Sequence, residues 1–198
     1  MHRLITAALI SSAAICSTPS LTLAQAHTES KVDIAFNRYY SFEQLVDFMY
    51  AFEREYPDLV TTEVIGKSQE GRDMVLVTIN NPETGADTDK PAMWIDGSIH
   101  ANEIQASEVC LYTIWYLTKS YGGNEMLTEI MDRTAFYILP VVNPDSRVYW
   151  FEEPSTPNSS RANKRPIDSD RDGLYDEDPP NDLDGDGSIT AMWKQEPG

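Results

Sequence analysis

A run of apolar residues in the middle of the chain restricts the possible folds more than any other part of the sequence. From Val109 to Leu117, eight of nine residues are apolar or aromatic, within a helix predicted from about Glu103 to Ser120. A helix that is apolar on all sides is buried on most of them. A short apolar strand (92–96) precedes this helix, and a longer one (134–142) follows a short helix at 125–132. Alternating strands and helices predict an α/β fold whose sheet is covered.

The N-terminal half supplies the other elements of the predicted domain, after an exposed lead-in that ends near residue 40. Ser41 and Gln44 have the spacing of a capping box, which predicts that a helix begins there. Strands are predicted at 60–65 and 74–79, joined by a turn. Asn143-Pro144-Asp145 is predicted to be a turn, after which the sequence becomes rich in proline, then in basic and acidic residues.

The first 26 residues have the form of a secretory signal peptide. They hold one basic residue and no acid, an apolar stretch, and a final Ala24-Gln25-Ala26. This order is typical of such leaders, and the apolar stretch is too short to span a bilayer comfortably. We therefore expect cleavage after Ala26 and a secreted or periplasmic protein without a membrane span. Cys110 is then the only cysteine, so no internal disulfide can form.

The charge of the chain excludes one class of partner. The 32 acidic residues against 15 basic ones give a net charge of −17. Nucleic acid binding requires clustered lysine and arginine side chains at the phosphates. We therefore expect no nucleic acid partner, and the sequence leaves the oligomeric state open.

Two residues between the strand at 92–96 and the apolar helix are candidate metal ligands. His100 and Glu103 follow a strand that we expect to be buried, and ligands bind at the carboxyl ends of strands in α/β sheets. A neutral imidazole and a carboxylate are suitable zinc ligands, although a third ligand must then come from elsewhere. The alternative is a histidine held by local hydrogen bonds and a glutamate that is favourable at a helix N-terminus.

Three motifs in this order resemble zinc carboxypeptidases of the carboxypeptidase A type. They are Ile65-Gly66-Lys67-Ser68-Gln69-Glu70-Gly71-Arg72, then Met93-Trp94-Ile95-Asp96-Gly97-Ser98-Ile99-His100-Ala101-Asn102-Glu103, and Asn143-Pro144-Asp145. The resemblance implies a mixed sheet covered by helices on both faces. It also implies that His100 and Glu103 bind Zn²⁺, and that the substrate is a peptide or protein with a free C-terminus.

The chain departs from the family pattern after these motifs. The family's third zinc ligand is a more distal histidine and its general base a late glutamate, but no histidine follows His100. We therefore expect an incomplete fold that belongs to a longer enzyme. Its expected parts are the signal peptide (1–26), the N-terminal part of the peptidase domain (27–166), an acidic insertion (167–187) and a truncated return into the domain (188–198). Its sheet would have an unpaired edge, which favours association or instability.

The resemblance also suggests residues that act on the substrate. In the family, an arginine after the Asn-Pro-Asp motif polarises the scissile carbonyl and stabilises the developing oxyanion. Arg161 is the best match for this catalytic role and Arg165 is the second. Asn143, Arg161 and Arg165 are the expected substrate-binding residues. The alternative is a solvated basic loop that neutralises the acids after it.

The acidic insertion contains two clusters in which acids alternate with other residues and end at a glycine. Such spacing is the first half of a calcium loop, because each turn can direct an oxygen inward and glycine permits the bend. Neither cluster has the final glutamate of an EF-hand. The alternative is an acidic loop kept extended by its own charge. The candidate Ca²⁺ ligands are Asp168, Asp170, Asp172, Asp176, Asp178, Asp182, Asp184 and Asp186.

The resemblance thus implies a zinc-dependent carboxypeptidase, in which metal-activated water hydrolyses the C-terminal peptide bond. This activity belongs to the full-length protein, and we expect the chain to be inactive alone. One alternative is a secreted calcium-binding module without catalysis. Another is an enzyme of the same fold that removes an acyl group from a small-molecule amide.

Overall fold

The structure, a computed structural model, describes residues 29–100, 102–152, 165–168, 170–175 and 182–189. Its centre is a four-stranded mixed sheet in the order β1-β2-β4-β3. The strands are Val60–Lys67 (β1), Asp73–Ile79 (β2), Ala92–Asp96 (β3) and Ala135–Leu139 (β4). The α-helices in the described residues are Phe42–Glu55 (α1), Gln105–Ser120 (α2), Glu125–Arg133 (α3) and Pro144–Glu152 (α4). Two short 3-10 helices, Pro82–Thr84 and Asp87–Asp89, lie in the connection to β3.

The sheet combines antiparallel and parallel pairs. β1 and β2 form an antiparallel hairpin, whose register shifts at a bulge between Val64 and Gly66. β2 also pairs antiparallel with β4, and β4 pairs parallel with β3. A parallel pair requires a crossover connection, which α2 and α3 provide here. The crossover brings the carboxyl end of β3 and the start of α4 to the same end of the sheet.

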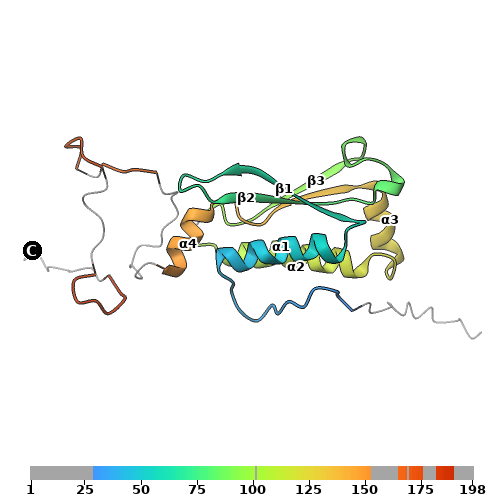
Figure 1. Cartoon of the computed structure of the whole chain (residues 1–198), viewed down its shortest axis with the longest axis horizontal. Helices are drawn as coiled ribbons and strands as arrows, with labels where there is room; N and C mark the ends of the chain where they lie inside the picture. The colour runs from blue at the N-terminus through green and yellow to red at the C-terminus, as the bar shows by residue number, and fades with distance from the viewer. Residues whose placement is uncertain (1–28, 101, 153–164, 169, 176–181, 190–198) are drawn as a thin grey trace, which may run out of the picture.

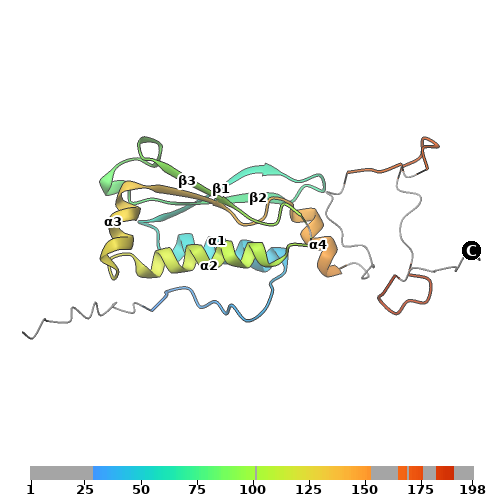
Figure 2. The same ribbon diagram turned by 180° about the vertical axis from the view of Figure 1, so that it is seen from behind.

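α1 and α2 lie against one face of the sheet (Figures 1 and 2). α1 begins at the expected capping box, in which Ser41 and Gln44 exchange side-chain to backbone hydrogen bonds. Its buried residues are those that the spacing predicts, and they join the strands and α2 in one core. That core includes Leu45, Met49, Phe52, Val77, Ile79, Leu111, Ile114 and Ile138, all of them fully or almost fully buried.

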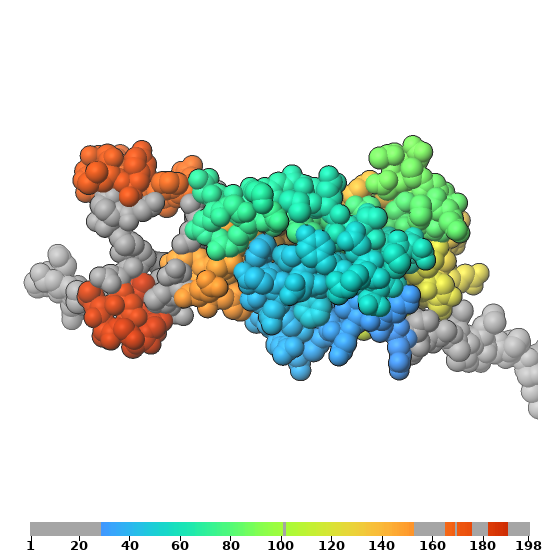
Figure 3. Space-filling view, viewed as in Figure 1, coloured from blue at the N-terminus to red at the C-terminus, as the bar shows by residue number. Residues whose placement is uncertain are grey.

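The lead-in before α1 is anchored more firmly than the sequence suggests. Figure 3 shows the lead-in and α1 on the lower part of one face, with the hairpin above them. Val32 and Tyr40 are buried in the core, so the expectation of an exposed lead-in is wrong for these two residues. The Tyr56 hydroxyl accepts a hydrogen bond from the Lys31 N–H, and the Tyr40 hydroxyl donates one to the Ala35 carbonyl.

β3 differs from the buried strand that its apolar residues predict. It is an edge strand, and the side chains of Met93 and Trp94 are 51% and 53% exposed. Val109 and Tyr112 of α2 are also exposed, although Tyr112 contacts Phe36 of the lead-in. Both differences have one cause, because a strand or helix is buried only where a neighbouring element covers it. Among the strands in the described residues, none pairs with the outer side of β3, so the expected unpaired edge lies there.

α4 is the element that sequence reasoning missed. The Asn-Pro-Asp motif was predicted to be a turn, but it begins a helix, Pro144–Glu152. Asn143 accepts a hydrogen bond from the Ser146 N–H through its side chain, as an N-cap residue does. Proline is favourable at the first position of a helix. These two features together could have predicted the helix.

The predicted α/β fold class, a mixed sheet with helices, is confirmed; among the described residues, α1 and α2 both lie on one face of the sheet (Figures 1 and 2). The other predicted elements are also present, with ends that shift by a few residues: the strand predicted at 134–142 ends at Leu139, and the helix predicted from Glu103 begins at Gln105. In the part of the chain that the structure describes, no helix is both long and apolar enough to cross a membrane.

Candidate metal centre

The backbone between β3 and α2 is fixed by hydrogen bonds to the chain that follows β4. The Gly97 N–H donates to the Leu139 carbonyl at 3.1 Å, and the Gly97 carbonyl accepts from the Val142 N–H at 2.9 Å. One residue further, the Asn143 N–H donates to the Ser98 carbonyl at 3.1 Å. We call residues 98–100 and 102–104 the ligand segment, because they include both candidate zinc ligands.

The structure brings His100 and Glu103 together at this end of the sheet. His100 Nδ1 and Glu103 Oε2 are 2.9 Å apart, and the two side chains are 39% and 44% exposed. Two donor atoms therefore converge at a place that solvent can reach. One imidazole nitrogen and one carboxylate oxygen are donors that zinc accepts, so the pair fits part of a zinc site.

The pair alone does not complete a zinc site, for which three protein ligands are usual. His100 is the only histidine among the described residues. In those residues, side chains that can hold a metal gather in groups of three at two places, both of them in the acidic insertion. The expected third ligand and general base are therefore not found in the part of the chain that the structure describes.

Ser98 precedes the candidate ligands in an unusual conformation. Its backbone φ is 53°, in the left-handed region that residues other than glycine rarely adopt. The Ser98 side chain is buried, its hydroxyl lies 2.7 Å from that of Ser107, and Ser107 donates to the Pro140 carbonyl. Backbone strain of this kind costs about 1–3 kcal/mol and is often found at functional sites. No sequence pattern indicated it.

The expected substrate-binding residues have different positions. Asn143 is half-buried, and its amide nitrogen donates to the Ile99 carbonyl at 3.3 Å while its oxygen caps α4. This side chain therefore contacts the ligand segment. Arg165 is exposed in a segment without regular structure. Arg161 lies outside the described residues, so its catalytic role stays a prediction.

Asp145 forms a cluster that the sequence analysis did not identify. It is buried, and its carboxylate accepts hydrogen bonds from the Ser68 hydroxyl at 2.6 Å, the Arg72 guanidinium at 2.8 Å and the Glu70 N–H at 3.0 Å. Burial alone would raise the pKa of Asp145, but these hydrogen bonds outweigh it and hold the pKa below its ordinary value. The first and third motifs of the sequence are thus in direct contact.

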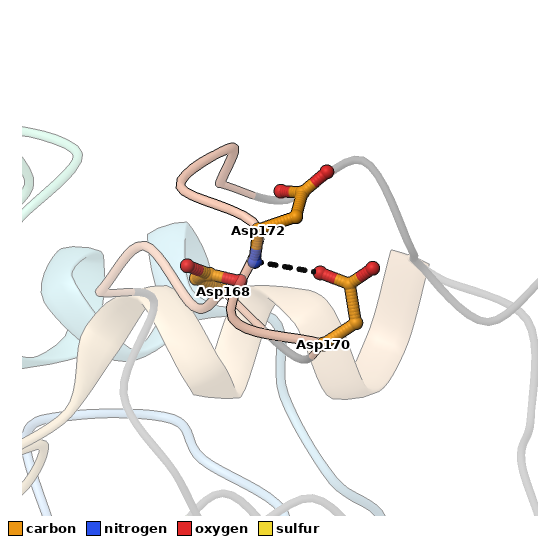
Figure 4. Close-up of side chains that lie close together, drawn as sticks. All are labelled: Asp168, Asp170 and Asp172. Carbon is orange, nitrogen blue, oxygen red and sulfur yellow. Dashed lines mark hydrogen bonds between the residues drawn. The ribbon is translucent and has the colours of Figure 1, made fainter.

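The acidic insertion holds two loops with matching backbone geometry. In each loop, the first aspartate, Asp168 or Asp182, accepts hydrogen bonds from two backbone N–H groups further along the loop. Figure 4 shows the first loop, in which Asp170 accepts from the Asp172 N–H. Potential ligand atoms of Asp168, Asp170 and Asp172 lie within 4.8 Å of one another, as do those of Asp182, Asp184 and Asp186.

The two acidic loops lie apart from each other, as Figure 3 shows, so each has its own set of carboxylates. Asp176 and Asp178, the remaining candidates, lie outside the described residues. Hydrogen bonds from the Gly187 and Gly185 N–H groups lower the pKa of Asp182 below its ordinary value.

Comparison with known proteins identifies one family. The model of a family described as zinc carboxypeptidase matches residues 45–188. Among curated proteins, the chain is 32% identical over 118 residues to carboxypeptidase B2 of Bos taurus, and 29% identical over 143 residues to carboxypeptidase D of Rattus norvegicus. It is also 32% identical over 126 residues to a protein of Saccharomyces cerevisiae named as an inactive metallocarboxypeptidase.

Solved structures give the same result. Thrombin-activatable fibrinolysis inhibitor matches with a TM-score of 0.60 and 29% identity, over 70% of this chain and 33% of that one. Carboxypeptidase A of Helicoverpa armigera matches with a TM-score of 0.58 and 26% identity, over 67% of this chain and 30% of that one. The chain spans 29% of the length of the yeast relative and 27% of carboxypeptidase B2.

Proposed function

The chain belongs to the zinc carboxypeptidase family, and on this premise we propose that it carries part of the catalytic centre of a zinc-dependent carboxypeptidase. The proposed reaction is hydrolysis of the C-terminal peptide bond of a peptide or protein, by the whole protein. Two observations support the proposal: the family match, and the convergence of His100 Nδ1 and Glu103 Oε2 at 2.9 Å beside the carboxyl end of β3.

We assign His100 and Glu103 as zinc ligands. When bound, zinc lowers the pKa of its water to near neutrality and polarises the substrate carbonyl. The partial exposure of both side chains leaves room for a further ligand and for substrate. Asn143, through its hydrogen bond to the Ile99 carbonyl, holds the backbone next to His100. Arg161 and, as the second candidate, Arg165 are the proposed cations for the oxyanion and the substrate.

Removal of either proposed ligand tests the assignment. We expect His100→Ala and Glu103→Gln to abolish zinc binding at this site, because each removes one of its two donors. The measurement is a zinc titration of the chain, followed by calorimetry for both variants and, where His100 is present, through its imidazole resonance. In the unaltered chain and in Glu129→Gln, an exposed glutamate on α3 as control, only the His100 resonance should shift. If the His100 resonance shifts as much in Glu103→Gln as in the unaltered chain, Glu103 is not a zinc ligand.

Family membership does not by itself establish activity, since one relative is named as inactive. The reaction is tested in the whole protein, with a peptide that has a free C-terminus and the same peptide with an amidated one. A carboxypeptidase shortens only the first. If both peptides also carry an N-terminal acyl group, release of that group from both would favour the amide-hydrolysing alternative.

We also propose that the protein is exported, with residues 1–26 as the signal peptide and cleavage after Ala26. The charged start, apolar middle and small-residue end support this proposal. N-terminal sequencing of the mature protein tests it. A mature chain that still begins at Met1 would contradict it.

A second role, calcium binding by the two acidic loops, is proposed because the loops share one backbone arrangement. We expect calcium to bind in preference to magnesium, which demands a more regular and less flexible ligand set. Calorimetric titration of the chain with each ion measures this, and Asp168→Asn combined with Asp182→Asn should abolish it. Equal, weak binding of both ions would indicate only a diffuse acidic surface.

A further inference from the structure

Arg147, on α4, is the largest fully buried side chain of the described residues, with none of its surface exposed. Removing a guanidinium from water costs several kcal/mol, so its donors must be satisfied inside the protein. Nη1 donates to the Ile104 carbonyl at 2.8 Å, and Nη2 donates to the Tyr40 carbonyl at 2.7 Å and to Glu108 Oε1 at 2.6 Å. One side chain thereby connects three segments.

The first of these acceptors belongs to the ligand segment. Ile104 directly follows Glu103 and is the N-cap residue of α2, without a side-chain hydrogen bond that caps the helix. Glu108 lies in the first turn of α2 and also accepts a hydrogen bond from the Tyr40 N–H at 3.1 Å. The start of α2 is therefore held by the Arg147–Glu108 ion pair and by the bond to Ile104.

The other end of the ligand segment is held by the same helix. Asn143 caps α4 and donates to the Ile99 carbonyl, next to His100. Asn143 and Arg147 are one helical turn apart, and the Arg147 N–H donates to the Asn143 carbonyl at 3.2 Å. α4 thus contacts the backbone on the outer side of each candidate ligand: Ile99 before His100, and Ile104 after Glu103.

A buried ion pair is a weak argument for stability alone. Apolar side chains of similar volume often stabilise a core as well or better. Among the described residues, Glu108 Oε2 and Arg147 Nε find no hydrogen-bond partner, so this pair is not optimised for stability. Apolar side chains cannot orient a neighbouring carbonyl group. A planar guanidinium fixes the angle and position of the carbonyls that it binds.

We propose that Arg147, paired with Glu108, is a positioning residue for the metal centre. It acts through the Ile104 carbonyl and sets the place of Glu103 relative to His100. The proposal rests on the proposed function, because it takes His100 and Glu103 as the zinc ligands. Groups that orient metal ligands typically contribute about 10–100-fold to metal affinity.

The test replaces the ion pair by apolar residues and measures zinc affinity and folding separately. In the double variant Glu108→Met/Arg147→Met no unpaired charge remains, so the chain should still fold without urea. It should unfold at a lower urea concentration than the unaltered chain, because backbone groups of Tyr40 and Ile104 lose their partners. Its zinc affinity, measured through the His100 imidazole resonance, should be about ten-fold weaker. Arg147→Lys keeps the charge but lacks the planar group, so it should also weaken zinc binding. Arg133→Met, which removes an exposed ion pair on α3, is the control.

The outcomes separate the two proposals. Unaltered zinc affinity in the double variant, or full rescue by Arg147→Lys, would show a merely structural ion pair and overturn the inference. If zinc does not shift the His100 resonance even in the unaltered chain, the zinc-ligand assignment fails, and the inference fails with it. A loss of zinc affinity in the double variant but not in Arg133→Met supports the inference.

Discussion

At the scale of single residues, Gly97 shows why the chain before the ligand segment tolerates little change. A Cβ atom at this position would lie 2.9 Å from the Ala106 carbonyl oxygen and 3.0 Å from that of Pro140. Both contacts are with backbone, which cannot rotate away as a side chain can. The close approach lets the chain after β3 pack between α2 and the end of β4.

We predict that Gly97→Ala lowers the free energy of unfolding by about 1–3 kcal/mol, the usual cost of overpacking a core. Urea unfolding followed by circular dichroism measures the change. Gly66→Ala is the matched control, because a Cβ there would meet only the Met74 sulfur, at 3.8 Å. Equal stability of the two variants would show that the backbone at residue 97 can move.

The sequence predicted the candidate ligands at this scale but not what holds them. His100 and Glu103 could be identified because few histidines are present and because the surrounding motif has a known form. Arg147 gave no such indication, because nothing in the sequence around it distinguishes a buried arginine from an exposed one. The strain at Ser98 was equally hidden, because φ depends on hydrogen bonds to residues distant in sequence, such as the one that Asn143 donates to the Ser98 carbonyl.

At the scale of elements, the turn of the β1–β2 hairpin is joined to the start of α4 by Asp145. Its carboxylate receives three hydrogen bonds from Ser68, Glu70 and Arg72, all in or beside that turn. Their net effect lowers the pKa of Asp145 below its ordinary value of 3.8. The charged form is therefore favoured in the folded chain relative to the unfolded one.

This linkage predicts a pH-dependent stability. Because the pKa is depressed in the folded state, the contribution of Asp145 is complete above pH 3.8 and is lost as the pH falls below that value. Asp145→Asn should lower the free energy of unfolding by about 1–3 kcal/mol at neutral pH, and the difference should shrink in acid. Urea unfolding at a series of pH values measures it, with Asp47→Asn on the exposed side of α1 as control. A difference that does not change with pH would contradict the assignment.

Sequence patterns predicted an element well where its burial depends on few neighbouring elements. The capping box and the spacing of Phe42, Leu45 and Met49 placed α1 correctly, because a helix with one apolar face needs only one partner. They did less well for β3 and the outer side of α2, where burial depends on which neighbours are present. α4 was missed because the same three residues, Asn143-Pro144-Asp145, can form a turn or the first turn of a helix.

At the scale of the whole molecule, the two edges of the sheet differ. β1 carries a bulge and a terminal lysine, Lys67, which discourage pairing with another chain. β3 has neither, and exposes Met93 and Trp94. An open, apolar edge strand of this kind is a surface on which another strand can add.

We therefore predict that the chain associates with itself as its concentration rises, and that Met93→Lys reduces this association. A charge beside the free edge opposes pairing and costs little in a monomer, since the side chain is already exposed. Sedimentation velocity over a range of concentrations measures the effect. Met126→Lys, at an exposed methionine of α3, is the control, and an equal effect of both variants would argue against an edge-specific contact.

The contacts of α4 also have a consequence for the order of folding. Ile104 and its partner Arg147 are 43 residues apart in the sequence, and Tyr40 and Arg147 are 107 residues apart. During synthesis, β3 and the start of α2 leave the ribosome well before α4 exists. Contacts between residues distant in sequence form late, because the intervening chain must first be ordered. We therefore expect the candidate ligands to reach their final arrangement among the last steps of folding, after the hairpin and α1 have packed together.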